Sequence, residues 1–354
     1  AKTPDVGARP NFVEEVSIEE TKWHSLWKTD SSPTDFSVKD VALGPLFTRQ
    51  AIVRAASSFE FGTSCLDGIP IKCIALCSHF LIDTLIYLFQ VASFFAYYPP
   101  AMGSMVVKLI DKKDNTFRPI VLFRSLYRLH GRLIATATRE WEKAARRNTP
   151  FENNQGRETL DSVFGCWVRQ AILVIAGTAS AAADILIDLR KCFEYLSREM
   201  LWKACSDHGY PMHVARMSLQ TYAWPRFILG NYDLCGKTVV ASRGIAAGSP
   251  FATTELKVYL LRLARALQIA AGPAVTLSMF VDDFSISTAQ DTEHETATVI
   301  TNTYRQAVQG LRSRPSCCSR QDRADCLIGL AQSTCSSGHP NLQLGQQLPQ
   351  AGSG

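Results

Sequence analysis

The residues best suited to chemistry are two adjacent aspartates, Asp282 and Asp283. Apolar and polar residues alternate in 274–279, before the pair, and in 284–288, after it. This pattern predicts a β-hairpin with both carboxylates at its tip. Adjacent carboxylates repel each other, and a bound cation relieves that repulsion. Mg²⁺ suits such hard oxygen ligands and commonly shares them with substrate phosphates. The pair is therefore a candidate metal site, with a turn of two solvated aspartates as the alternative.

A third carboxylate belongs to a separate predicted strand. Residues 183–189 are typical of a buried strand in which Asp184 and Asp188 share one face, because their separation is even. A loop of small residues, 243–250, leads into a helix whose leucines recur every three or four positions. Glycines in such a loop allow the backbone to approach a ligand closely. Three carboxylates and a glycine-rich loop form a neighbourhood suited to a nucleotide.

Basic residues are concentrated in one block, with 11 Lys and Arg against 4 Asp and Glu in 108–147. Two β-prone runs predict a hairpin with strands at 105–110 and 117–120. Lys and Arg on such a hairpin could clamp a triphosphate, with an exposed basic hairpin as the alternative. A long basic helix is predicted over 124–147. The block is either the footprint of a phosphate backbone or a solvated helix face.

The composition is that of a globular protein, with 354 residues, 46% of them apolar and 19% charged. A net charge of +5 is weak evidence for a nucleic-acid partner, whereas 11 cysteines, an odd number, favour reduced intracellular thiols. Four cysteines near the C-terminus lie close to His339, but their spacing matches no usual zinc pattern. The apolar segment 73–100 contains His79, Asp83 and Gln90, so we predict a buried helix pair and no membrane partner.

Taken in order along the chain, these elements resemble the reverse transcriptase family. The resemblance is strongest to the branch from non-long-terminal-repeat (non-LTR) retrotransposons and group II introns, and it covers roughly residues 50–310. Three segments match family motifs A, B and C: 188–193, 244–250 and 280–283. Three more segments support the resemblance from the fingers side: 62–70, 117–120 and 155–157. Each segment alone is modest evidence, but all six occur in the same order as in the family, which makes the resemblance strong.

The resemblance implies an RNA-directed DNA polymerase that uses two Mg²⁺ ions, with Mn²⁺ as the alternative metal. In two-metal catalysis one ion activates the attacking hydroxyl, here the primer 3′-hydroxyl, and the other stabilises the leaving group, at a separation of about 4 Å. By resemblance, Asp188 and Asp282 bridge the ions from adjacent strands and Asp283 assists. The backbone carbonyl of Leu189 is expected to complete the coordination.

The resemblance also implies the substrate contacts, with an RNA template, a DNA primer and deoxynucleoside triphosphates (dNTPs) as partners. Lys112 and Arg118 match the positions that hold the triphosphate, although Lys113 is an alternative to Lys112. Gly248, the second glycine of motif B, is expected to contact the substrate. An aromatic at the position of Phe193 lies under the sugar in this family and collides with a 2′-hydroxyl, which favours DNA synthesis. A simple core aromatic is the alternative for Phe193.

The implied fold is α+β, with the fingers and palm of a right-hand polymerase and a ferredoxin-like palm sheet with helices on one face. We expect a polar N-terminal extension at 1–40, fingers at 41–175, a palm at 176–312 and a tail at 313–354. The tail lacks clear periodicity, so we expect it to be degenerate or disordered and the thumb to be absent. The expected location is intracellular, in the nucleus.

One position departs from the family pattern, because Ala247 stands where motif B commonly has Gln. The difference affects the contact to the incoming nucleotide or template and leaves the metal ligands intact. A decayed reverse-transcriptase-like domain that binds nucleic acid without copying it is therefore the main alternative. An unrelated hydrolase built on the same carboxylates would need a water-activating base, and the nearest histidine, His294, is predicted on the following helix.

Overall fold

The computed structural model divides the chain into two units. The first unit comprises residues 1–145 and 191–259, and the second comprises 146–190 and 260–354. The structure describes residues 12–28, 34–40, 46–63, 65–111, 117–145, 181–189, 191–229, 235–312 and 333–335, together with the single residues 168, 175 and 179. Helices and strands occur in both units, so the predicted α+β class is confirmed.

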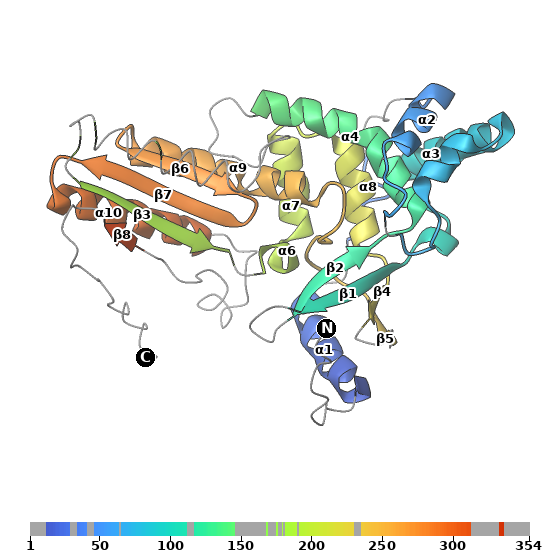
Figure 1. Ribbon diagram of the computed structural model, residues 1–354, viewed down its shortest axis with the longest axis horizontal. Helices are drawn as coiled ribbons and strands as arrows, with labels where there is room; N and C mark the ends of the chain where they lie inside the picture. The colour runs from blue at the N-terminus through green and yellow to red at the C-terminus, as the bar shows by residue number, and fades with distance from the viewer. Residues whose placement is uncertain are drawn as a thin grey trace, which may run out of the picture. The chain divides into compact units, whose positions relative to one another are not determined.

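The first unit contains a mixed sheet of four strands in the order β2-β1-β4-β5 (Figure 1). The strands are β1 (Met105–Asp111), β2 (Phe117–Leu122), β4 (Arg226–Leu229) and β5 (Cys235–Val239). β1 pairs antiparallel with β2, which confirms the predicted basic hairpin, and parallel with β4. The residues that join β1 to β2, 112–116, lie outside the described part of the chain. The antiparallel pair β4–β5 was not predicted from the sequence.

The described part of the first unit also contains helices. They are α1 (Phe12–Trp27), α2 (Arg49–Ser57), α3 (His79–Phe95), α4 (Ser125–Ala145), α6 (Cys192–Tyr195), α7 (Arg198–Asp207) and α8 (Met212–Tyr222), with the short 3₁₀ helices η1 (Ile71–Leu76) and η2 (Pro100–Met102). The long helix α9 (Ala252–Ala271) begins in the first unit and ends in the second.

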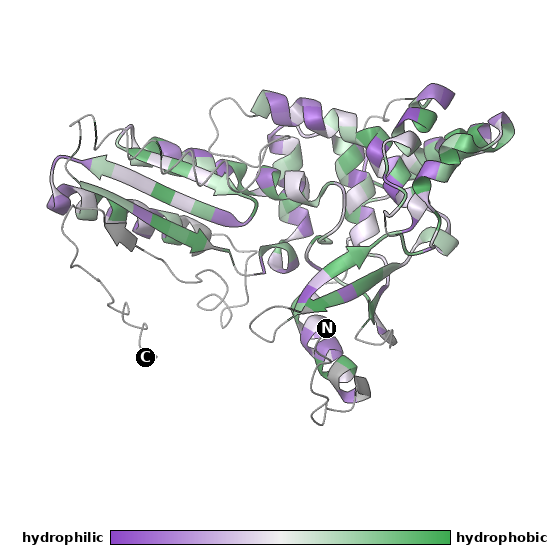
Figure 2. Cartoon of the chain, in the orientation of Figure 1, coloured by the Kyte–Doolittle hydropathy of each residue, from purple (hydrophilic) through white to green (hydrophobic). Residues whose placement is uncertain are grey.

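The apolar segment 73–100 forms part of η1 and all of α3, which is green over most of its length in Figure 2. The predicted buried helix pair is therefore wrong: the segment has one α-helix, and Phe80 and Tyr87 on it are exposed. One face of α3 packs into the first unit's core, where the Phe89 ring stacks on His130 at a centroid distance of 4.7 Å. The Tyr98 hydroxyl lies 2.5 Å from His130 Nδ1, and burial lowers the pKa of His130 to about 3. None of the described helices is both long and apolar enough to cross a membrane.

Hydroxyl side chains cap several of the described helices. Ser197 accepts a hydrogen bond from Met200 N at the start of α7, and Thr292 accepts one from Glu295 N at the start of α10 (Glu293–Arg312). Helix α2 begins at Arg49 and is capped by the Thr48 hydroxyl, which accepts from Ala51 N.

The second unit contains an antiparallel sheet in the order β6-β7-β3-β8 (Figure 1). Its strands are β3 (Ala181–Asp188), β6 (Val275–Phe280), β7 (Asp283–Gln290) and β8 (Ser333–Cys335). Helix α10 packs on β3 and β7, where Thr296 Oγ1 donates to Ala181 O at 3.3 Å. On β3 and β7, Ile187 and Ile286 are fully buried, so alternating apolar residues anchor the strands that carry the aspartates.

Candidate active site

The Asp282–Asp283 pair lies at the tip of the β6–β7 hairpin, as predicted. Phe280 pairs with Asp283, so Val281 and Asp282 form a two-residue turn. Val281 has φ +58°, a left-handed conformation that is rare for a β-branched residue and is strained by about 1 to 3 kcal/mol. Such strain persists only where the surrounding structure enforces it, which here fixes the orientation of the turn.

The third aspartate of the predicted set reaches the same end of the sheet. In the antiparallel β3–β7 pair, Asp188 stands directly opposite Asp283. Directly opposed residues of such strands have Cα atoms about 4.5 to 5.5 Å apart. The backbone N–H of Leu189 donates to Asp282 O at 3.2 Å, which extends the pairing past the turn. Strand register therefore gathers the backbones of all four predicted metal-binding residues at one edge.

The donors at this edge fit a hard divalent cation. The side chains of Asp282 and Asp283 are half-buried, and the side chain of Asp188 lies outside the described part of the structure. Among the described side chains, no three or more His, Cys, Asp or Glu residues form a cluster able to hold a metal. Carboxylate and carbonyl oxygens are nevertheless the ligand type that Mg²⁺ takes, and the register brings the backbones of the residues that carry them to one place.

The glycine-rich loop 244–250 starts against the segment that carries Phe193. Gly244 N donates to Leu196 O and Ile245 N donates to Phe193 O, both at 2.8 Å. Gly244 has φ +77°, and a Cβ there would lie 2.6 Å from Glu194 O. Only glycine fits this close approach of two backbones. Phe193 is half-buried beside the loop, in the short helix α6.

The other end of the loop lies against β2. Val121 N donates to Ala247 O at 2.8 Å, so Ala247 contributes its carbonyl to this contact. Gly248 is exposed, has φ +111°, and leaves no room for a Cβ, which would lie 2.4 Å from Val121 O. Arg118 is three residues before Val121 on the same strand. The loop therefore connects the elements that carry Phe193, Gly248 and Arg118.

The basic hairpin presents an additional cation that the sequence analysis missed. Ile110 pairs with Arg118 and Lys108 pairs with Ile120, so all four residues share one face. Both Lys108 and Arg118 are exposed. The predicted Lys112 and its alternative Lys113 lie outside the described residues, so Lys108 is the described lysine on the face of Arg118. The hairpin register would have identified it, because cross-strand partners point to one side.

The supporting segment 62–70 is tied to the start of α4. Leu66 N donates to Phe123 O at 3.1 Å, and the Asp67 carboxylate accepts from Ser125 N at 3.0 Å and from Ser125 Oγ at 2.7 Å. Asp67 thus caps α4 from a distant part of the chain. The other supporting segment, 155–157, lies outside the described residues.

Arg198, a buried arginine that was not predicted from the sequence, holds the start of the loop in place. The guanidinium of Arg198 donates to the carbonyls of Gly244 and Ala241, both at 2.8 Å, and of Tyr222 at 2.7 Å. Burial, followed by the nearby Arg226, lowers the pKa of Arg198. Nothing in the sequence distinguishes this arginine from a surface one, because its role depends on distant carbonyls.

Helix α1, in the predicted N-terminal extension, packs on the same loop. Trp27 O accepts from Ser242 N at 2.9 Å and from Arg243 N at 3.2 Å, and Arg243 Nε donates to Leu26 O at 2.6 Å. The Arg226 guanidinium lies 4.5 Å from the centre of the Trp27 ring. The i, i+4 spacing of Trp23 and Trp27 was the available signal for this helix.

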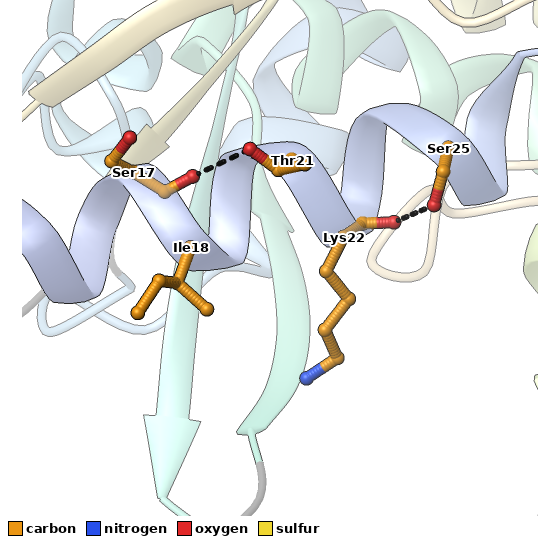
Figure 3. A pocket seen from close by; sticks show the side chains of 5 residues that line it. All are labelled: Ser17, Ile18, Thr21, Lys22 and Ser25. Atoms are coloured by element: carbon orange, nitrogen blue, oxygen red, sulfur yellow. Dashed lines mark hydrogen bonds between the residues drawn. The ribbon is translucent and has the colours of Figure 1, made fainter.

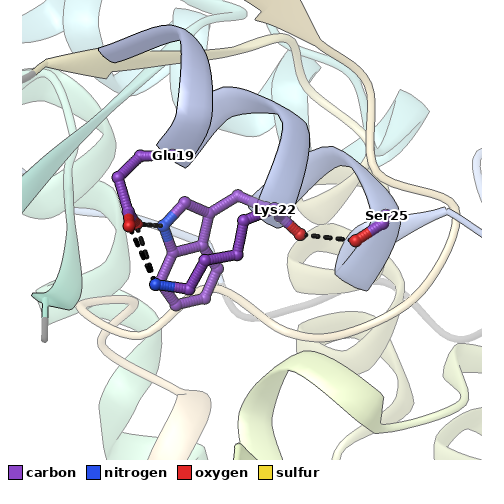
Figure 4. Close-up of polar contacts among 4 residues, drawn as sticks. Glu19, Lys22 and Ser25 are labelled. Atoms are coloured by element: carbon purple, nitrogen blue, oxygen red, sulfur yellow. Dashed lines mark hydrogen bonds and ion pairs between the residues drawn. The ribbon is translucent and has the colours of Figure 1, made fainter. Parts of the chain in front are cut away.

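The polar contacts of α1 itself are structural. Glu19 accepts from Lys22 Nζ at 2.9 Å and from Trp23 Nε1 at 2.8 Å (Figure 4). The pocket drawn in Figure 3 is lined by α1 alone, through Ser17, Ile18, Thr21, Lys22 and Ser25. Its one charged group, Lys22, is already paired with Glu19, so this pocket adds no chemistry.

Comparison with known proteins identifies the relatives of the chain. The family model described as "Reverse transcriptase (RNA-dependent DNA polymerase)" matches residues 110–318, more than half of the sequence. A search of curated proteins finds no match. A solved structure of apo telomerase from Candida Tropicalis, truncated from its C-terminal domain, is similar with 11% identity and a TM-score of 0.47. The match covers 69% of this chain and 52% of the telomerase chain, so this chain spans about half of that protein.

Proposed function

Because the chain belongs to the reverse transcriptase family, we propose that it forms the fingers and palm of an RNA-directed DNA polymerase. The parent element we infer is a retroelement of the non-LTR or group II intron type. The observation that carries the proposal is the register of the second unit's sheet, which sets Asp188 opposite Asp283 beside the Asp282 turn. Carboxylates gathered on adjacent strands are what two-metal nucleotidyl transfer requires.

In this mechanism Asp188, Asp282 and Asp283 would hold two divalent ions, with the Leu189 carbonyl as a further ligand. When bound, the ions would supply charge stabilisation for attack of the primer 3′-hydroxyl and for the leaving pyrophosphate. The protein's contribution is to fix these oxygens through the strained turn at Val281 and the paired strands. Repulsion among the carboxylates in the absence of a cation favours binding of the ions.

The first unit would bind the incoming nucleotide. Arg118, with Lys112 and the newly identified Lys108, would bind the triphosphate, Arg by its planar fork and Lys as a point charge. Gly248, without a side chain, would let the nucleotide approach the backbone of the loop. Phe193 would exclude a 2′-hydroxyl sterically and so select dNTPs.

The test is primer extension on an RNA template with Mg²⁺, comparing the wild-type chain with Asp282→Ala. We expect the substitution to reduce the rate by about a thousandfold or more, because several kcal/mol of charge stabilisation are lost. Asp184→Asn is the matched control, since Asp184 lies on β3 but pairs with Ser287, away from the turn. Equal extension by wild type and Asp282→Ala would refute the assignment.

Substrate selection is tested with Phe193→Ala. We expect this variant to incorporate ribonucleotides more readily, because the side chain that meets the 2′-hydroxyl has been removed. Measured ratios of kcat/KM for dNTP and ribonucleotide decide the point, and an unchanged ratio removes Phe193 from this role.

The second candidate function is nucleic-acid binding without synthesis, which Ala247 favours because the family commonly has Gln there. Under that reading the wild-type chain binds an RNA–DNA hybrid but extends no primer. Reduced binding after Arg118→Ala, together with no extension at any Mg²⁺ concentration, would support this second function over the first.

A further inference from the structure

A buried carboxylate lies directly behind the glycine-rich loop. Glu255, in the first turn of α9, is fully buried and accepts hydrogen bonds from two hydroxyls of α8, those of Ser218 and Tyr222. The Tyr222 hydroxyl lies 2.5 Å from Glu255 Oε2. In the described part of the chain, no Lys or Arg forms an ion pair with Glu255. A carboxylate held only by hydroxyls needs an explanation, because burial of a charge is costly.

The same tyrosine connects this carboxylate to the loop. The buried Tyr222 hydroxyl lies 3.1 Å from Ser249 Oγ, and Ser249 is the neighbour of Gly248. A hydroxyl has one proton, so while Tyr222 donates to Glu255 it can only accept from Ser249. An ionised Glu255 therefore orients the whole chain of hydrogen bonds, from Ser249 to Tyr222 to the carboxylate. A protonated Glu255 can donate a proton itself, which allows the chain to reverse.

The position of Ser249 matters for the rest of the loop. Its Oγ accepts from Phe251 N at 3.4 Å, and its backbone N–H donates to Ala246 O at 2.9 Å. Gly248, next to it, lies against the backbone of Val121, so a shift of Ser249 is transmitted to β2, the strand that carries Arg118.

Among the described ionisable groups packed around Glu255, Glu255 is the one whose pKa lies near neutral pH. They come from α4, α7, the α7–α8 connection and α8, and they are Tyr127, Cys205, Tyr210 and Tyr222. Burial, followed for three of them by the negative charge of Glu255, raises the pKa of all four. Burial also raises the pKa of Glu255, to about 7.

We propose that Glu255 is a positioning residue for nucleotide binding, which acts through Tyr222 on Ser249 to hold the loop 244–250 in its binding conformation. The inference rests on the proposed polymerase function for its kinetic readout. The ionised carboxylate is the form that holds the loop, because it can only accept and so keeps both Ser218 and Tyr222 as donors.

The kinetic experiment measures KM for dNTP and kcat in primer extension between pH 6 and pH 8.5. For the wild-type chain we expect KM to rise about fivefold as the pH falls through 7, the equivalent of one ordinary hydrogen bond. In Glu255→Gln and Tyr222→Phe, KM should be raised about fivefold at pH 8 and should not change with pH, whereas the pH profile of kcat stays that of the wild type.

Glu142→Gln is the matched control. Glu142 also contacts α9, through Thr254 Oγ1 at 2.8 Å and Lys257 Nζ at 2.9 Å, but has no link to Ser249. Its removal should leave KM and its dependence on pH unchanged. A Glu255→Gln variant that keeps the wild-type change of KM with pH would overturn the proposal.

A second readout does not depend on catalysis. Hydrogen–deuterium exchange of the amides in 244–250, compared at pH 8, should be about fivefold faster in Tyr222→Phe than in the wild type. Exchange in 181–189, on β3, should be the same in both proteins. If the wild-type chain extends no primer, the proposed function fails while this exchange experiment still tests the link through which Glu255 would act, from Tyr222 to Ser249. Equal exchange of the loop in both proteins would refute it.

Discussion

Replacing Glu255 by Gln should change how the stability of the first unit depends on pH. The pKa of this carboxyl is about 7 in the folded chain and 4.5 in its ordinary state. Since the folded state raises the pKa, it favours the protonated form. Below pH 4.5 both states are protonated and the group is neutral to stability. Above pH 7 both are ionised, and the folded state bears the full cost of a buried charge.

The magnitude follows from the same two values. Each pKa unit corresponds to about 1.4 kcal/mol, so ionisation of Glu255 lowers the free energy of unfolding by about 3 kcal/mol. This loss develops between about pH 4.5 and pH 7. Gln has nearly the same shape and does not titrate. The variant should therefore become more stable relative to the wild type as the pH rises, by about 3 kcal/mol in total.

Urea denaturation at several pH values between 5 and 8, followed by tryptophan fluorescence, measures this difference. Of the six tryptophans in the chain, the five outside 146–190 belong to the first unit, which also contains Glu255. His130 contributes its own pH dependence, because burial lowers its pKa to about 3, but it does so in both proteins and cancels in the difference. A difference that stays constant from pH 5 to pH 8 would show that Glu255 ionises without cost and would refute the reasoning.

Three further predictions test other parts of the structure. Gly248→Ala should raise KM for dNTP by about tenfold, because its φ is +111° and a Cβ would lie 2.4 Å from Val121 O; an unchanged KM in primer extension would contradict this. Val281→Gly should raise the free energy of unfolding by up to about 1 kcal/mol in thermal melts, because relief of left-handed strain exceeds the added entropy of the unfolded chain; a lower melting temperature would argue against strain at the turn. Arg243→Ala should speed amide exchange in 12–28 by tenfold or more, since a charged hydrogen bond to Leu26 O is worth about 1.5 to 3 kcal/mol; equal exchange would show that α1 is held by other contacts.

The elements that carry the aspartates were predictable because their signals are local. Period-two alternation predicted the hairpin around Asp282, and a short apolar run predicted the buried strand over 183–189 that forms β3. Once both strands are paired, the need to bury Ile187 and Ile286 on one face excludes a register shifted by a single residue. The capping box of Thr292 and Glu295 is equally local.

The parts that were missed depend on contacts between distant segments. No sequence pattern marks Glu255 as the buried carboxylate of its helix, because its burial is set by Ser218 and Tyr222 on α8. Arg198 looks like any surface arginine until the carbonyls of residues 241–244 surround it. Lys108 was overlooked because its relation to Arg118 requires the hairpin register.

The docking of α1 has a consequence for synthesis on the ribosome. Trp27 and Leu26 find their partners in Ser242 and Arg243, 215 and 217 residues later in the chain. At translation rates of 5 to 20 residues per second, those partners are synthesised roughly 10 to 40 s after the helix. Until then the indole of Trp27, almost fully buried in the finished protein, is exposed to water or bound by a chaperone. The first unit is thus completed only after its last segment, 191–259, has been translated.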